Sequence, residues 1–340
     1  MFVSERGSAD LATADRNTVP ESPDSVEARL VIAIVTFRRP ERLSRTLELV
    51  GEQLSKLLEA RAVAVCSILV VDNDPDESAL SCVRSAYSGV STRYVAESQP
   101  GIPAARNRAL LESGQDDLLT FIDDDEVPLV GWISSLLTTW DKYGKPAAVA
   151  GRVVSIFSAD VDPWILESGL FQRGQKLTGT PVATAATGNL LLDLNQVRRL
   201  GVRFDERIGL GGGSDTLFTR TLHQRGAQMV WCNESVAEDA VEPERQTRKW
   251  ALKRAFSHGN VATSVRLRLE DNATRRLAIR TQSVVGGVAR LVFGAARAAL
   301  GVIVRSERHD ARGRRLAWRG AGMLSASFGK AYHAYARSAK

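Results

Sequence analysis

From Arg29 onward, continuous apolar runs alternate with stretches in which leucine or alanine recurs at helical spacing. Apolar runs without alternation are typical of strands covered on both faces. Such strands are predicted at residues 29–36, 67–72, 92–97 and 118–122. Helices are predicted at residues 39–60, 77–87 and 102–113. This alternation predicts an α/β fold with a mostly parallel, Rossmann-like sheet, right-handed crossovers and helices on both faces.

The pattern is less regular after Trp132. Further strands are predicted at residues 146–157, 186–193 and 228–232, and a helix at residues 214–226. Residues 157–184 combine Asp, Pro, Trp and Gly without periodicity, which predicts a loop near the substrate. We therefore expect one large domain over residues 29–260.

The two ends of the chain differ from this domain. Residues 1–28 are polar and lack an apolar core of signal-peptide length, which predicts a disordered leader and no secretion. Residues 261–340 are rich in Arg and Ala and predict a basic, amphipathic helical tail. In its most apolar stretch, residues 281–304, the longest uncharged run is nine residues, against about 20 for a membrane span. That stretch suits a helix lying on anionic lipid or a helix packed on the domain.

Composition adds an asymmetry of charge. The 340 residues, 44% of them hydrophobic, are enough to bury a full core. Residues 241–340 hold 21 Lys and Arg against 6 Asp and Glu, whereas residues 1–240 hold 24 against 33. A basic tail on an acidic body indicates an anionic partner, either a membrane surface or nucleic acid, or else serves solubility alone. Three cysteines without a C-x-x-C spacing favour a reducing, cytoplasmic compartment.

Polar residues follow each of the first four predicted strands. They are Thr36 to Arg38, Asp72 to Asp74, Glu97 to Ser98, and Asp123 to Glu126. Ligands of parallel sheets bind outside the carboxyl ends of the strands, so we predict a site at this edge.

The acidic run after the fourth strand needs a source of positive charge. Two like charges 4 Å apart repel by about 4 kcal/mol at an effective dielectric constant of 20. On an extended strand end, Asp123 and Asp125 point the same way, about 7 Å apart. Such hard oxygen ligands suit Mg²⁺ or Mn²⁺ that also binds a phosphate. The alternative is a solvated acidic loop that caps the following helix.

Seven ordered motifs in residues 30–260 resemble those of glycosyltransferase family 2, which has the GT-A fold. The motifs are VIAIVTFRRPERL (31–43), VVDNDPDESA (70–79), ESQPGIPAARNRAL (97–110), FIDDDEVPLVGW (121–132), TGNLLLD (187–193), FDERIGLGGGSDTLF (204–218) and EDAVEPERQTRKWALKRAFSHGN (238–260). Within the family, the sequence is similar to bacterial exopolysaccharide glucosyltransferases of succinoglycan type.

This resemblance implies roles in binding the nucleotide sugar. Thr36 and Arg38 would contact the nucleobase or ribose, and Asp72 would accept the N3–H of uracil. Asn73 stands where many relatives have a second Asp, and Arg106 and Asn107 would contact nucleotide or pyrophosphate.

The resemblance also implies how the metal is held. In the D-x-D motif, Asp123 would bond ribose or a metal-bound water, Asp125 would bind the metal, and Asp124 would belong to the nucleotide-sugar site. The metal, Mn²⁺ or Mg²⁺, would neutralise the leaving nucleoside diphosphate.

Inverting relatives take their base from an Asp just before a helix, which here implies Asp215, with Ser214 in place of the usual Glu. The alternative is that one of these two residues caps the helix. Arg245, Arg248 and Trp250 would meet pyrophosphate or acceptor. Lys249 replaces the Arg of the processive Gln-x-x-Arg-Trp signature, which implies a non-processive enzyme.

The implied activity is inverting, metal-dependent transfer of one hexose from a UDP-sugar, favouring UDP-glucose, to a lipid-linked saccharide. Such a hexosyltransferase would act in exopolysaccharide or cell-envelope glycan synthesis, peripherally on the inner face of the membrane. Rhamnose, mannose and galactose remain open as the sugar. Sugar-phosphate nucleotidyltransferases are disfavoured because TFRRPER (36–42) lacks their glycine-rich loop. Nucleic-acid binding is disfavoured because the basic tail lacks interleaved aromatic residues on a strand platform.

Overall fold

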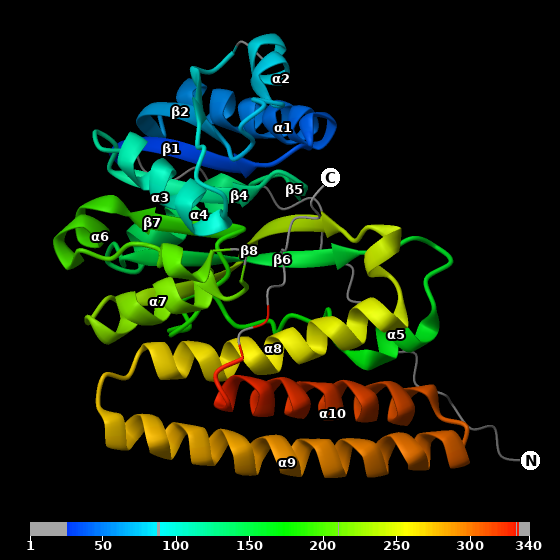
Figure 1. The fold of residues 1–340 in the computed structure, drawn as a ribbon. Coiled ribbons are helices and arrows are strands. Elements are labelled where there is room, and N and C mark those ends of the chain that lie inside the picture. Colours follow the sequence, from blue (N-terminus) through cyan, green and yellow to red (C-terminus); the bar gives the residue numbers. More distant parts are fainter. Residues whose placement is uncertain (1–25, 87–88, 210, 331, 333–340) are drawn as a thin grey trace, which may run out of the picture.

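The chain folds into one curled, eight-stranded mixed sheet with helices on both faces and a layer of three long helices beneath it (Figure 1). The computed structural model describes residues 26–86, 89–209, 211–330 and 332. Residues 1–25 of the predicted leader lie outside the described residues, and residues 26–28 lie in the first strand.

The elements have these bounds. The strands are β1 (Val26–Thr36), β2 (Val63–Asp72), β3 (Thr92–Ala96), β4 (Leu118–Asp123), β5 (Glu126–Pro128), β6 (Ala148–Ile156), β7 (Asn189–Asp193) and β8 (Met229–Ala240). The helices are α1 (Pro40–Glu59), α2 (Leu80–Ser85), α3 (Ile102–Glu112), α4 (Trp132–Lys142), α5 (Pro163–Ser168), α6 (Leu194–Leu200), α7 (Ser214–Gln224), α8 (Arg248–Arg268), α9 (Ala273–Ile303) and α10 (Glu307–Ser327), with 3₁₀ turns η1 (Glu206–Ile208) and η2 (Pro243–Arg245).

The sheet runs in the order β3-β2-β1-β4-β7-β6-β8-β5. β1 pairs in parallel with β2 and β4, and β2 pairs in parallel with β3, as the strand–helix alternation predicts. β7 is antiparallel to β4 and β6, and β5 is antiparallel to β8, whereas β6 and β8 are parallel. The α/β class is confirmed, with a mixed second half of the sheet.

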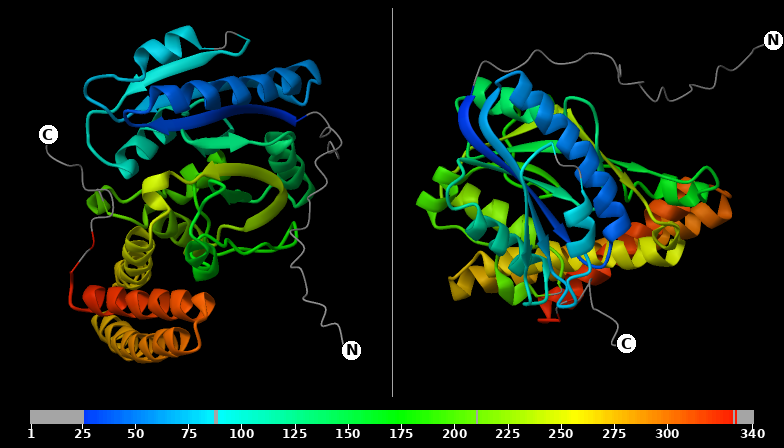
Figure 2. Two further views of the ribbon diagram at one scale, coloured as in Figure 1. Left: turned by 90° about the vertical axis from the view of Figure 1, so that its right-hand side faces the viewer. Right: turned by 90° about the horizontal axis from the view of Figure 1, so that it is seen from above.

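β1 shows why its sequence is apolar without alternation. Leu30, Ile32 and Ile34 join the core under α1 and α4, whereas Val31 and Ala33 join the core under α3, α6 and α7. Both faces of the strand are therefore covered, and the two helix layers are seen on either side of the sheet in Figure 2.

Several features differ from the expectations, beginning with β5 and α6, which were not predicted. The loop predicted over residues 157–184 contains α5, whose first turn is capped by Asp162. β8 extends to Ala240, well past the predicted end at residue 232, because its last residues pair with β6 on one side and with β5 on the other. The predicted boundary after residue 260 falls inside α8.

The C-terminal helices are present as expected and form a packed layer. α9 and α10 are antiparallel neighbours joined by a short turn (Figure 1), and they approach closely through glycines. A Cβ atom at Gly294 would lie 2.4 Å from the backbone nitrogen of Ala317, and one at Gly313 would lie 2.4 Å from that of Ala298. The hairpin therefore depends on residues without large side chains at these crossings.

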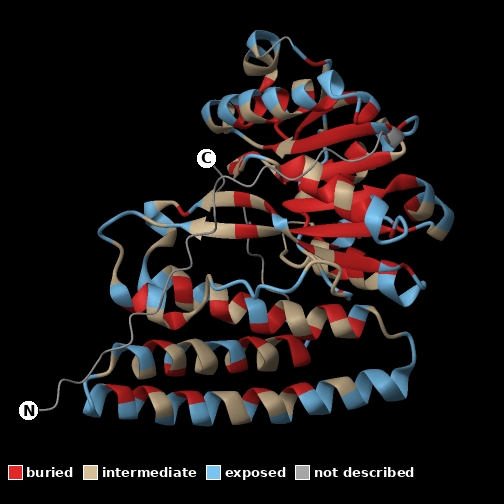
Figure 3. Ribbon diagram, turned by 180° about the vertical axis from the view of Figure 1, so that it is seen from behind, coloured by how far each residue is buried: buried red, intermediate tan, exposed pale blue. Residues whose placement is uncertain are grey.

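α9 has two unlike sides. It is the one described helix long and apolar enough to cross a membrane by length and composition, with a mean hydropathy of 1.4 over its most apolar window. Only 17% of that window is buried, and Figure 3 shows exposed residues along the outer side of the helix. One side of α9 thus packs on α10, and the other is open and rich in apolar residues, including Val285, Val292 and Phe293.

Candidate active site

The parallel register of the central strands brings their carboxyl ends level with one another. Thr36 at the end of β1 is in register with Asp72 of β2, and Val35 is in register with Asp123 of β4. The polar residues that follow these strands therefore meet at one edge of the sheet, where ligands of such sheets bind.

Asp72 and Asn73 shape the loops at this edge. Asp72 is fully buried and accepts hydrogen bonds from the backbone of Asp74 (3.1 Å) and Ala79 (2.8 Å) and from the hydroxyl of Tyr94 (3.1 Å). Burial, together with the Asp72 charge, raises the pKa of Tyr94. The resemblance implies that Asp72 accepts the N3–H of uracil, but in this structure both of its carboxylate oxygens accept hydrogen bonds from the protein itself.

The Asn73 side chain clamps the loop between β3 and α3. It donates to the carbonyl oxygens of Glu97 (2.9 Å) and Gln99 (2.7 Å) and accepts from the backbone of Gly101 (2.9 Å). An amide can do this where a second carboxylate cannot, because a carboxylate has no donor.

Arginines at the end of β1 bind two different acidic groups. Arg38 has a left-handed backbone (φ 55°) and forms ion pairs with Asp74 (3.0 Å) and Asp76 (2.6 Å) while remaining half-exposed. Arg39, which the sequence analysis did not single out, forms ion pairs with Asp124 (3.2 Å) and Asp125 (2.8 Å). The sequence held a signal for this pairing, because Arg38 and Arg39 follow one buried strand and an acidic run follows another.

The three consecutive aspartates face different partners. Asp124 is buried and accepts from the Thr36 hydroxyl (2.7 Å). Burial and the Asp125 charge raise the pKa of Asp124, although hydrogen bonds from Thr36 and Arg39 oppose them. Asp125 is held by Arg39, whereas the Asp123 side chain is 45% exposed and lies 3.5 Å from Arg106.

Arg106 connects the end of β4 to the start of α7. Its guanidinium is almost fully buried, lies over the ring of Phe204 (5.7 Å to the centroid) and is 2.6 Å from Asp215 Oδ1. Because Arg106 also approaches Asp123, one cation holds two carboxylates from elements far apart in the chain.

Asp215 is positioned by a second set of contacts. Ser214 Oγ donates to Asp215 Oδ1 (2.9 Å), and the backbone nitrogen of Thr187 donates to Oδ2 (3.4 Å). Burial acts to raise the pKa of Asp215, but Arg106 and the Ser214 hydrogen bond outweigh it and lower the pKa. The helix is capped by Gly213 (φ 95°), so the alternative that Ser214 or Asp215 caps it is wrong.

A second acidic pair lies beside the aspartates. Glu126 of β5 is directly opposite Asp239 of β8, and it is buried. Burial and repulsion from Asp123 raise the pKa of Glu126 well above its usual range, and burial and Asp125 raise that of Asp239. Gly188 gives these groups room, since a Cβ atom there would lie 2.6 Å from Glu126 Oε1 and 3.0 Å from Asp123 Oδ2.

The charge at this edge suits a divalent cation. Although part of its side chain is exposed, Asp123 lies among protein groups that desolvate its carboxylate and raise its pKa to about 6. Arg106 opposes this shift, and repulsion from Asp125, Asp215 and Asp124 adds to it. Among the described residues, no three His, Cys, Asp or Glu side chains converge as a complete metal site. Asp123 and Asp125 have the hard carboxylate oxygens that Mg²⁺ or Mn²⁺ prefers, and phosphate and water would have to supply the other ligands. Asp125 would exchange its ion pair with Arg39 for the cation.

Four other residues predicted to belong to the site, Asn107, Arg245, Arg248 and Trp250, make contacts outside the cluster of aspartates and Arg106. Asn107 donates to Phe204 O (3.0 Å) and accepts from Phe204 N (2.9 Å). Arg245 lies 3.4 Å from Glu242, near the acidic end of β8. Arg248 binds Asp162 (2.6 Å) and Trp250 stacks on Phe171 (5.7 Å, 12°), which places both beside α5.

Comparison with known proteins identifies relatives. Residues 31–198 match the model of the family described as Glycosyl transferase family 2. The chain is 28% identical over 230 residues to the Succinoglycan biosynthesis protein ExoM of Rhizobium meliloti (strain 1021), covering 67% of this chain and 72% of that protein.

Solved structures show the same fold at low identity. The mannosyltransferase PcManGT from Pyrobaculum calidifontis, in complex with GDP-Man and Mn²⁺, has a TM-score of 0.55 at 17% identity over 89% of each chain. GalNAc-T7 with UDP, GalNAc and Mn²⁺ has a TM-score of 0.51 at 14% identity. The match covers 72% of this chain and 51% of GalNAc-T7, so this chain spans about half the length of that structure. These likenesses confirm the GT-A fold.

Proposed function

Residues 31–198 make this chain a family 2 glycosyltransferase, and on that premise we propose that it moves one hexose from UDP-glucose to a lipid-linked saccharide with inversion. The observation that carries the proposal is the position of Arg106, whose guanidinium lies between Asp123, on the donor side, and Asp215. A base beside the nucleotide-binding edge is what an inverting transfer requires.

In the proposed reaction, Asp215 acts as the base. The acceptor hydroxyl oxygen attacks the anomeric carbon, the bond to the diphosphate breaks on the opposite face, and Asp215 takes the hydroxyl proton. Arg106 keeps Asp215 ionised, and Ser214 and Thr187 orient its two oxygens. Ser214 thus takes over part of the orienting role of the acid found at that position in relatives.

The nucleotide would occupy the edge formed by Thr36, Arg38, Asp72 and Asp124. Asp123 and Asp125 would hold Mn²⁺ or Mg²⁺, which when bound neutralises the negative charge on the leaving diphosphate. Two solved relatives support a divalent cation, because both PcManGT and GalNAc-T7 contain Mn²⁺. Their nucleotides differ, GDP in one and UDP in the other, so the preference for UDP-glucose rests on the resemblance to exopolysaccharide enzymes.

We also propose that the protein acts on the inner face of the membrane. ExoM is a succinoglycan biosynthesis protein, and the lipid-linked saccharide is our own proposal for the acceptor of this chain. The exposed apolar side of α9 and the excess of Lys and Arg after residue 240 support binding to an anionic lipid surface.

A screen of nucleotide sugars tests the donor and the metal together. The full chain is incubated with UDP-, GDP- and TDP-sugars, with Mn²⁺ or with EDTA, and release of the nucleoside diphosphate is measured. We expect Mn²⁺-dependent hydrolysis, highest with UDP-glucose. The variant Asp125→Ala should lose Mn²⁺-dependent nucleotide binding, whereas Asp141→Ala, on the surface of α4, should keep it. Retained Mn²⁺-dependent binding in Asp125→Ala would remove the metal assignment.

A further inference from the structure

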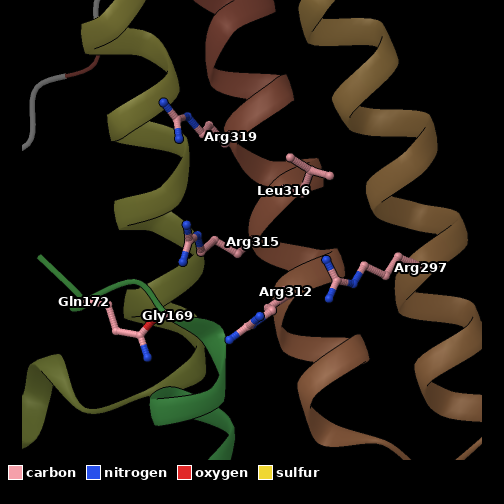
Figure 4. A pocket seen from close by; sticks show the side chains of 7 residues that line it. All are labelled: Gly169, Gln172, Arg297, Arg312, Arg315, Leu316 and Arg319. Carbon is pink, nitrogen blue, oxygen red and sulfur yellow. The ribbon is translucent and has the colours of Figure 1, made fainter. Parts of the chain in front are cut away.

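A cavity lies in the helical layer, apart from the acidic edge of the sheet. Its volume is about 360 Å³, within the range of small-ligand pockets. It is lined by Gly169, Gln172, Arg297, Arg312, Arg315, Leu316 and Arg319 (Figure 4). The three arginines of α10 are three and four residues apart, so they project from one side of that helix, and Arg297 reaches toward them from α9.

The pocket concentrates positive charge that the protein itself does not neutralise. None of the four arginines forms an ion pair with a carboxylate in the described part of the chain. Arg312 and Arg315 donate only to backbone oxygens, those of Glu167 (3.2 Å) and Ser168 (2.6 Å). Arg297 Nε is buried and has no hydrogen-bond partner among the described residues.

Neighbouring groups show the strength of this positive field. Burial and the charges of Arg319 and Arg312 lower the pKa of Arg315. The side chain of His258 is exposed, yet nearby protein groups desolvate its imidazole and, with the charges of Arg254, Arg319 and Arg315, lower its pKa. Guanidinium groups gathered in this way suit phosphate oxygens, which they bind in a bidentate manner.

The pocket is connected to the active site through one short loop. Gln172 lines the pocket, and the next residue, Arg173, lies 3.6 Å from Asp239 at the acidic edge. On its other side, the pocket is bounded by α9, whose outer surface exposes Val292, Phe293 and Leu300. It therefore lies between the proposed site of sugar transfer and the proposed lipid-facing surface.

We propose that Arg297, Arg312, Arg315 and Arg319 form a phosphate-binding pocket, and that its ligand is the phosphate or diphosphate of the lipid-borne acceptor. The second half of this proposal rests on the proposed function. Holding the acceptor by its phosphate would place the attached saccharide toward Asp215 and leave the lipid toward the membrane.

Calorimetry on the full chain, in EDTA and without nucleotide sugar, tests the pocket with inorganic pyrophosphate as the probe. The test variant is Arg297→Gln/Arg319→Gln, because neither side chain has a hydrogen bond or ion pair with a described residue, so its folding should be preserved. The control is Arg276→Gln/Arg280→Gln, which removes the same charge from exposed positions of α9 outside the pocket. We expect pyrophosphate to bind wild type and the control alike, and at least about tenfold more weakly to the test variant.

If pyrophosphate binding weakened equally in both double variants, at unchanged melting temperatures, the proposed phosphate-binding pocket would be wrong. It would also be wrong if pyrophosphate did not bind to wild type. Geranyl diphosphate distinguishes a lipid-borne ligand from a free anion, and we expect it to bind more tightly than pyrophosphate. Equal affinities would overturn the assignment to a lipid-borne acceptor. A chain that binds pyrophosphate in this pocket but hydrolyses no nucleotide sugar would contradict the proposed function alone.

Discussion

At the scale of single residues, the site depends on which carboxylate is paired with which arginine. Asp124 and Asp125 are tied to Arg39, and Asp215 is tied to Arg106, whereas Asp123 has a looser contact and a more exposed side chain. Desolvation raises the pKa of Asp123 and of Asp124, whereas Arg106 lowers that of Asp215, so neighbouring acids of one chemical type differ in protonation.

Replacing Asp215 with Asn tests the base. The variant keeps the shape of the side chain but accepts no proton, so we expect transfer to fall by about 10²- to 10⁴-fold while donor binding is retained. Transfer is measured with radiolabelled donor, and donor binding by calorimetry. Turnover close to that of wild type would instead direct the search for the base to Glu238 or Asp239.

Replacing Arg106 with Gln tests the cause of the lowered pKa of Asp215. Burial acts to raise the pKa of Asp215 and the Arg106 guanidinium acts to lower it, so removal of the guanidinium should raise this pKa. The base works only when ionised, and the acidic limb of the pH profile of kcat/KM should therefore move to higher pH. The donor KM should rise as well.

The pH profile of Arg108→Gln provides the control for this prediction. Arg108 lies on the same helix but is directed to Glu112, so its acidic limb should match that of wild type. An unshifted limb in Arg106→Gln would show that another group sets it.

At the scale of elements, glycines at the contact between α9 and α10 allow the backbones of these two helices to approach closely. The contacts of Gly294 with the backbone of α10 differ from those of Gly286, whose nearest neighbours would be the flexible ends of Arg290 and Met323. Close packing therefore requires a glycine at position 294, whereas the space around Gly286 would accept a larger residue.

This difference predicts opposite effects of the same substitution. Gly294→Ala should destabilise the protein by about 1–3 kcal/mol, because its Cβ meets backbone atoms that cannot move aside. Gly286→Ala should be neutral or stabilising by up to about 1 kcal/mol, because alanine favours the helix. The free energies of unfolding from urea titrations measure both. Equal losses would mean that the helices do not approach closely at Gly294.

At the scale of the whole molecule, acidic and basic groups are segregated. The strand-end edge gathers carboxylates, whereas the helical layer carries unneutralised arginines and an exposed apolar side on α9. Under the proposed function, this arrangement would orient the protein on a negatively charged surface with the helical layer toward the lipid.

Vesicle flotation tests this orientation. The full chain should float with phosphatidylglycerol vesicles and should float less with phosphatidylcholine vesicles, and added salt should weaken the binding to phosphatidylglycerol. Phe293→Asp, at a side chain 69% exposed on α9, should weaken binding. Leu111→Asp, at an exposed leucine on α3, should not. Equal effects of the two substitutions would contradict binding through α9.

The sequence alone determined the first half of the sheet, the helices that connect its strands and the edge at which polar residues gather. This was possible because strand and helix periodicities reflect local burial, as the two-faced packing of Leu30 to Ile34 in β1 illustrates. The segments of α5 and β8 were less predictable, since their apolar residues pack against elements distant in the chain.

Only the tertiary structure decided the pairing of charges. Arg39 meets Asp125 across 86 positions of sequence, and Arg106 meets Asp215 across 109. The arginine pocket likewise needs α9 and α10 to pack side by side before Arg297 can face Arg312. Such contacts depend on strand register and helix packing, which many buried contacts determine together. The residues that meet therefore show no periodic pattern in the sequence from which their contact could be predicted.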